Sequence, residues 1–131
     1  MKRKILFLAV IFVLSASAVF AQQTRKGHFE IVKTDQGKFY FVLLSANGQE
    51  ILKGYQFGSE DKVREAIAKV KQQAAGEENF DPRSEKEQFY FFLKGAEGKA
   101  LARSENYTTE AAMKRGIESV RRTAPEAEIK L

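Results

Sequence analysis

The stretch FYFVLLSANGQEIL, residues 39–52, returns fifty positions later as FYFFLKGAEGKALA, residues 89–102. A shift of 50 positions aligns residues 38–75 with residues 88–125 without a gap, and 10 of the 38 aligned pairs are identical. Chance would supply about two identities over such a length, so the chain contains a duplicated structural unit.

Each copy predicts strands before a helix. Aromatic and β-branched residues at 38–44 predict a strand, with shorter strands at 29–32 and 49–53. Asn47-Gly48 predicts a type I′ hairpin turn, because both central residues of that turn need positive φ. Gly37 offers the same freedom in the preceding turn.

The apolar period then changes from two residues to the spacing of a helix. Ser59 and Thr109 are the expected N-caps of these helices, and a short strand at 128–131 is expected to end the chain. Each unit therefore reads β-β-β-α-(β). The residues that carry the helical spacing are Val63, Ala66, Ile67, Val70 and Ala74 in the first copy and Met113, Ile117, Val120 and Ala124 in the second.

The predicted organisation is a unit at 29–75, a connector at 76–88 and a second unit at 89–131. Pro82 stands where the second unit should have its first strand, and proline cannot donate to a sheet ladder. That strand is therefore expected at an edge, shortened or absent. A fifty-residue unit buries too little apolar surface to fold alone, so we expect one shared core.

The first 21 residues have the layout of a signal peptide. Lys2, Arg3 and Lys4 precede an apolar run at 5–14, and small residues lead to a predicted cleavage after Ala21. Ten apolar residues are too few for a membrane span, which needs about 20. We expect an exported protein, periplasmic or secreted, with no stable membrane insertion after cleavage and a flexible stretch at 22–28.

The charge balance argues against a nucleic-acid partner. The chain carries 22 basic and 17 acidic residues, a net charge of +5, and three of the basic residues belong to the predicted signal peptide. The remaining part carries +2, which gives little long-range attraction for a polyanion. The sequence contains no cysteine, so it has neither a disulfide framework nor a thiolate metal site.

Residues 29–131 resemble the YegP-like family, bacterial domains of about fifty residues that often occur in pairs, and the second copy carries the more specific motifs. The residues that carry the resemblance are Asn47-Gly48, Gly98, Arg103-Ser104-Glu105-Asn106-Tyr107, Gly116-Ile117-Glu118-Ser119-Val120 and Ala124-Pro125. The first copy departs from the pattern, with Gly54-Tyr55-Gln56-Phe57 in place of S-E-x-Y. The resemblance implies an α+β fold: one antiparallel sheet from two β3-α-β units, both helices on one face, and closing strands exchanged between units. It implies no activity.

Strand alternation divides the aromatic residues between two faces. Phe39, Phe41 and Leu43 are expected in the core, and the opposite face would carry Tyr40, Val42, Tyr90 and Phe92. These four residues form the candidate binding face, since an uncovered apolar patch often marks a partner surface. The alternative is that the connector, the closing strands or a second subunit covers them.

The residues that could carry catalysis show no constellation. His28 is the only histidine, no cofactor or metal site is predicted, and the acidic residues fall mainly in turns, helix starts and the connector. We therefore expect a non-catalytic binding module for a protein or small-molecule ligand, monomeric or dimeric. The alternatives are a structural, self-associating envelope protein and a small hydrolase that uses carboxylates alone. The acidic residues considered are Asp35, Glu50, Glu60, Asp61, Glu77, Glu78, Asp81, Glu85 and Glu87.

Overall fold

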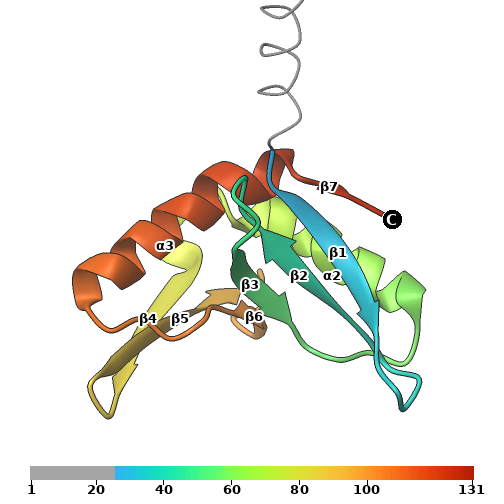
Figure 1. The fold of residues 1–131 in the computed structure, drawn as a ribbon, viewed down its shortest axis with the longest axis horizontal. Helices are drawn as coiled ribbons and strands as arrows, with labels where there is room; N and C mark the ends of the chain where they lie inside the picture. Colours follow the sequence, from blue (N-terminus) through green and yellow to red (C-terminus); the bar gives the residue numbers. More distant parts are fainter. Residues whose placement is uncertain (1–25) are drawn as a thin grey trace, which may run out of the picture.

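The computed structural model describes residues 26–131 (Figure 1). The predicted signal peptide, with its cleavage after Ala21, and residues 22–25 lie outside the described residues. His28 is the first residue of a strand, so the stretch expected to be flexible ends before it. Among the described residues, no helix has the length and apolarity that a membrane crossing requires.

The described chain forms seven strands, two α-helices and two short 3₁₀ turns. In chain order these are β1 (His28–Lys33), β2 (Phe39–Leu44), β3 (Glu50–Gly54), α2 (Glu60–Gln73), η1 (Glu77–Asn79), β4 (Phe80–Glu85), β5 (Gln88–Lys94), β6 (Ala100–Arg103), α3 (Glu110–Thr123), η2 (Ala124–Glu126) and β7 (Glu128–Ile129).

The strands form one sheet in the order β4-β5-β6-β3-β2-β1-β7, which confirms the predicted α+β fold. Strands β3 and β6 join the two units at the centre through an antiparallel pair. Strand β7 follows the second unit's helix but pairs with β1 of the first unit, so the expected exchange of closing strands occurs in one direction, from the second unit to the first. This pair is parallel, so the sheet is mixed rather than wholly antiparallel, because the chain enters β7 beside the start of β1 (Figure 1).

One apolar core serves both units. Phe29, Phe41 and Leu43 of the first unit and Phe91 and Leu93 of the second are fully buried in the same cluster. Both helices cover this face, with the predicted caps: Ser59 Oγ accepts from the Lys62 amide at 3.3 Å and Thr109 Oγ1 from the Ala112 amide at 3.0 Å. The units therefore share one core.

The turn at Asn47-Gly48 differs from the prediction. Gly48 has φ 85° and its amide donates to the Ser45 carbonyl at 2.9 Å, whereas Asn47 is not among the residues with positive φ. This is the longer hairpin loop with one left-handed glycine, rather than type I′. The two-residue turn with two positive φ values lies instead at Lys86 (51°) and Glu87 (63°), where the sequence has no glycine.

Strand β4 is a six-residue edge strand, one of the three outcomes left open for the region around Pro82. Phe91 uses both its backbone groups on Ser104: its amide donates to Oγ at 2.9 Å, and its carbonyl accepts from the Ser104 amide at 2.9 Å. Pro82 pairs with Phe91 in register, so the backbone of Pro82 faces the free edge. The missing N–H therefore costs the sheet no internal hydrogen bond.

Candidate functional site

A single row of side chains crosses the sheet face opposite the helices. The strand registers place Lys53 of β3 directly opposite Arg103 of β6 at the centre of this row. Apolar side chains flank the two cations and acidic side chains end the row. The row, in order across six strands, is Glu30, Val42, Lys53, Arg103, Phe92 and Asp81.

Each central cation packs over a tyrosine of its own unit. Lys53 Nζ lies 4.9 Å from the centroid of the Tyr40 ring, and Arg103 Cζ lies 4.0 Å from that of Tyr90. Cations at these distances are attracted by the negative faces of the rings. Arg103 also donates from Nη2 to Asn106 Oδ1 at 2.9 Å, and neither cation makes an ion pair within residues 26–131.

The expected uncovered apolar patch requires correction. Val42 is only 7% exposed, so it offers little surface to a partner. Tyr40, Tyr90 and Phe92 are partly buried, since Lys53, Arg103 and Arg83 lie over their rings. The alternation placed these four side chains on one face, but it could not show that long cationic side chains from neighbouring strands fold back over the rings.

A shallow hollow of about 390 Å³ opens beside the two cations. It is lined by Lys53 and Arg103 together with Glu50, Tyr55, Glu105 and Asn106, among others. Glu105 Oε1 accepts from Gln49 Nε2 at 2.9 Å, which links the two units across the sheet. The hollow therefore brings together two cations, two carboxylates and an exposed ring at the junction of the repeats.

Acid–base chemistry has limited support at this face. Asp81 ends the row, and its pKa is lowered by the hydrogen bonds from Arg83, with Oδ2 2.8 Å from Nη2. A general acid needs the opposite shift. His28 Nε2 contacts Glu30 Oε2 at 2.8 Å, and no cluster of three metal-ligating side chains occurs in the described part of the chain.

The S-E-x-Y residues have structural roles that the sequence reading did not assign. Ser104 is 6% exposed, and its hydroxyl accepts from the Phe91 amide and donates to the Glu105 carbonyl at 2.8 Å. The Tyr107 ring stacks on Phe91 with centroids 6.4 Å apart. Desolvation, with a smaller contribution from Glu105, raises the pKa of Tyr107 to about 12.

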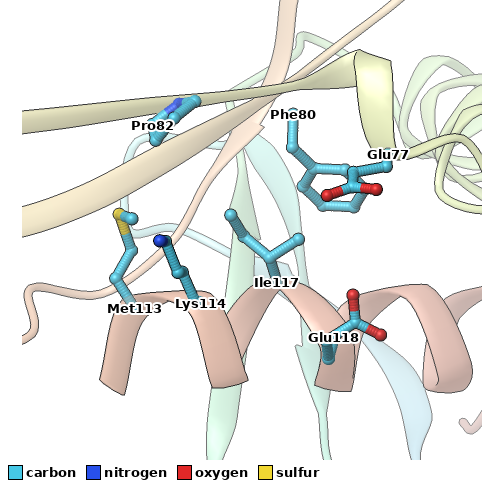
Figure 2. A pocket seen from close by; sticks show the side chains of 7 residues that line it. All are labelled: Glu77, Phe80, Pro82, Met113, Lys114, Ile117 and Glu118. Atoms are coloured by element: carbon cyan, nitrogen blue, oxygen red, sulfur yellow. The ribbon is translucent and has the colours of Figure 1, made fainter. Parts of the chain in front are cut away.

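A second concave site lies between β4 and α3, and no sequence signal pointed to it. Figure 2 shows Met113 and Ile117 of α3 pointing toward Pro82 and Phe80 of β4, with charged side chains at the rim. The volume is about 400 Å³. The groove exists only because two elements meet, so a single-element pattern could not reveal it. The rim residues are Glu77, Lys114 and Glu118.

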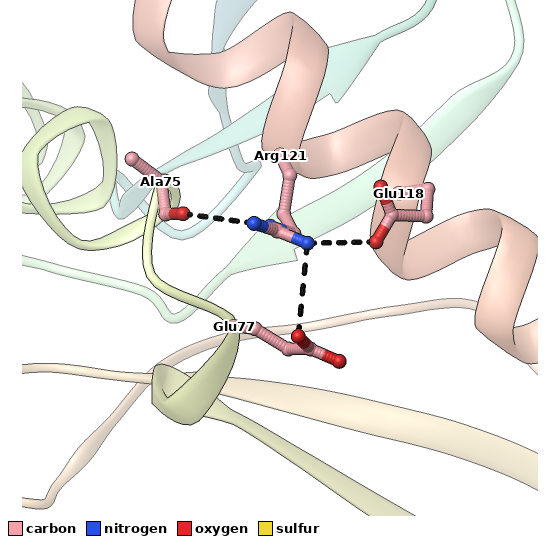
Figure 3. Close-up of polar contacts among 4 residues, drawn as sticks. All are labelled: Ala75, Glu77, Glu118 and Arg121. Carbon is pink, nitrogen blue, oxygen red and sulfur yellow. Dashed lines mark hydrogen bonds and ion pairs between the residues drawn. The ribbon is translucent and has the colours of Figure 1, made fainter.

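Arg121 anchors η1 to α3 at one end of this groove (Figure 3). Its Nη1 lies 2.8 Å from Glu118 Oε1 and 4.0 Å from Glu77 Oε2, and its Nη2 donates to the Ala75 carbonyl at 3.4 Å. The guanidinium thus joins both acidic rim residues to the end of the first unit.

Two comparisons with known proteins find relatives. The Domain of unknown function (DUF1508) matches residues 35–81 and again residues 84–130. The solution NMR structure of the protein of unknown function yegP from E. coli is 30% identical, with a TM-score of 0.75, over 80% of this chain and 91% of that one. The solution NMR structure of a UPF0339 protein from Shewanella oneidensis is 28% identical, with a TM-score of 0.76, over 80% and 90%. No curated protein matches the chain.

Proposed function

Because the chain belongs to the DUF1508 family, which has no assigned function, we propose its function from the chemistry of its own surface. It acts as a non-catalytic binding module that holds an anionic group of a ligand or partner over Lys53 and Arg103. The predicted signal peptide at residues 1–21 supports placing this module outside the cytoplasm.

One observation supports this proposal above the others. Lys53 and Arg103 stand directly opposite each other on neighbouring strands, where like charges destabilise a sheet. Both are exposed, and neither has an acidic ion-pair partner in the part of the chain that is described. A carboxylate or phosphate between them would relieve this repulsion with charge-assisted hydrogen bonds.

The tyrosines below the cations support the same proposal. Tyr40 and Tyr90 hold the two long side chains against the sheet, so less rotamer freedom is lost when an anion binds. The carboxylates in the adjacent hollow, Glu50 and Glu105, would repel an extended polyanion and favour a compact group.

The two alternatives have less support. A second copy stacked face to face would add two more cations to the centre of the row, which disfavours self-association through this face. A carboxylate-only hydrolase would need an acid and a base in contrasting environments, whereas Glu50 and Glu105 share one open hollow.

An NMR titration of the isotopically labelled chain with inorganic phosphate, citrate and a short peptide that carries a single glutamate tests the proposal. At least one of these anions should shift the backbone signals of Lys53 and Arg103 and the ring signals of Tyr40 and Tyr90. Replacing both cations, Lys53→Gln with Arg103→Gln, should weaken that binding at least tenfold.

The matched control removes the same amount of positive charge from another part of the surface. Arg115→Gln with Arg122→Gln removes two exposed cations of α3 and should leave the binding intact. Equal losses in both double variants would show that only net charge matters, and an absence of shifts with all three anions would refute an anion site.

A further inference from the structure

The two units differ at their outer edges. Beside β1 lies the closing strand β7, and Ile129 of that strand packs against the core. The equivalent edge, beside β4, has no neighbouring strand within the described chain. The first unit's helix leads through η1 directly into β4, so this unit contributes no separate closing strand.

The strand registers show that the two edges are equivalent. Phe29 pairs with Leu43, and Phe80 pairs with Leu93, which is the equivalent of Leu43 in the second unit. Each phenylalanine also meets the next aromatic ring edge-on, at 5.7 Å for Phe29 and Phe41 and 5.6 Å for Phe80 and Phe91. The edge of β1 that β7 covers in the first unit therefore has an equivalent in the second unit, the free edge of β4.

The helix residues beside the two edges differ in exposure in the same way, buried beside the covered edge of β1 and partly exposed beside the free edge of β4. Ile67 of α2 is 2% exposed, whereas its equivalent Ile117 of α3 is partly exposed and lines the groove of Figure 2. With Phe80, Pro82 and Met113 it forms an apolar floor beneath the free edge of β4.

We propose that this groove binds a short extended segment of another protein, which lies parallel to β4 as β7 lies beside β1. The segment carries a small residue, an aliphatic residue two positions later and a basic residue after that, the pattern of Ala127, Ile129 and Lys130. Ala127, which precedes β7, is 2% exposed, and the amide of Lys130, which follows β7, donates to the Phe29 carbonyl at 2.8 Å.

Counting strands favours a partner over a second copy. Residues 26–131 provide two outer edges, at β1 and β4, and one closing strand, β7, so copies that exchange β7 leave as many edges uncovered as before. A segment from a different protein covers the free edge of β4 and leaves β7 on β1, so Phe29 and Ile129 stay covered. Glu118 is paired with Arg121 at 2.8 Å, but Glu77 lies 4.0 Å from Arg121 and its side chain is 79% exposed, so Glu77 suits a basic residue beside the aliphatic one.

The edge also limits the length of the bound segment. The Phe80 carbonyl is equivalent to the Phe29 carbonyl that receives β7, whereas the Phe80 amide already donates to Glu77. Pro82 has no N–H to extend the ladder. The segment therefore makes few main-chain bonds, and its aliphatic side chain in the groove supplies most of the binding.

A synthetic peptide with the sequence of residues 125–131, PEAEIKL, is the probe. Added to the labelled chain, it should shift the signals of Phe80, Met113 and Ile117 and leave those of Lys53 and Arg103 unchanged. The same peptide with Ile129→Asp should bind at least tenfold more weakly. The double variant Lys53→Gln with Arg103→Gln should bind PEAEIKL normally, which separates this site from the proposed anion site.

Protein variants then place the site. Ile117→Glu should weaken PEAEIKL binding at least tenfold while the chain remains folded by circular dichroism; if this variant unfolds, the comparison of the two peptides still decides. Shifts confined to the β1 edge, equal binding of both peptides, or no shift at millimolar peptide would each overturn the proposal.

Discussion

The two repeat units differ at the contact between the helix and the segment that leads into it. In the second unit a Cβ built on Gly116 would lie 2.2 Å from the Tyr107 hydroxyl oxygen, so the glycine leaves space for that hydroxyl. The first unit has Phe57 and Ala66 at the equivalent positions, and both line the same hollow. One unit thus carries a hydroxyl where the other carries a methyl group.

A second pair differs in the same manner. Ser104 of the second unit bonds to the Phe91 amide, whereas the first unit has Gly54, where a Cβ would lie 2.2 Å from the Phe41 ring. Two of the departures from S-E-x-Y in the first unit therefore change which atoms fill the same space: Phe57 with Ala66 replaces Tyr107 with Gly116, and Gly54 leaves room for the Phe41 ring where the second unit has the Ser104 hydroxyl. They explain how one fold accommodates two divergent copies, and they can be tested by exchanging residues between the units.

The largest expected difference concerns the helix residues at the two edges. Ile67→Ala should lower the free energy of unfolding by about 3–4 kcal/mol, because it empties a closed part of the core. Ile117→Ala should cost about 1–2 kcal/mol, since that side chain already borders the groove. Urea denaturation should show one transition for each variant, as one core predicts; equal losses would contradict an open groove.

Grafting the second unit's serine into the first tests the exchange at the strand end. Gly54→Ser should destabilise by about 2–3 kcal/mol, because its Cβ meets the buried Phe41 ring. The reciprocal Ser104→Gly should cost about 1–2 kcal/mol, since it leaves the Phe91 amide without a partner. A neutral Gly54→Ser in thermal melts would show that the Phe41 ring can move aside.

The tyrosine–glycine pair should show a change of sign. Gly116→Ala alone should destabilise by about 1 kcal/mol, because contact with the Tyr107 hydroxyl outweighs the better helix propensity of alanine. In a Tyr107→Phe background the same change should stabilise by up to about 1 kcal/mol, as the first unit's Phe57 and Ala66 suggest. A double-mutant cycle measures this coupling, and additive effects would refute it.

The smallest expected effect separates the units at alkaline pH. An unfolded tyrosine ionises near pH 10, whereas Tyr107 in the fold has a pKa of about 12, so the unfolded state binds fewer protons between these values. The contribution is complete below pH 10 and is lost as the pH rises toward 12, by about 1 kcal/mol after allowance for the half-exposed ring. Tyr107→Phe should show a shallower decline than wild type in urea titrations, and identical slopes would contradict the shift.

Much of the fold could be predicted because its signals are local. The fifty-residue offset, the period of two at 38–44 and the caps Ser59 and Thr109 each depend on residues close in sequence, and all appear in the structure. The turn at Asn47-Gly48 was assigned the wrong type, because the following strand contains a bulge opposite Leu43 and Leu44 that lengthens the loop.

For the candidate site, the sequence predicted which face of the sheet the side chains occupy but not which other side chains cover them. Alternation placed Tyr40 and Tyr90 on the face away from the helices, but their cover depends on the register of other strands. Val42 showed the same limit, since its low exposure results from its neighbours across the sheet.

The amino-acid sequence by itself determined the duplication, the order of elements in each unit and the need for a shared core, because spacing and composition act through neighbouring residues. Tertiary structure alone decided that Lys53 faces Arg103, that β7 covers one edge and leaves the other open, and that Tyr107 fills the space above Gly116. Those contacts join residues far apart in the chain, and only the strand registers and the packing of the helices bring them together.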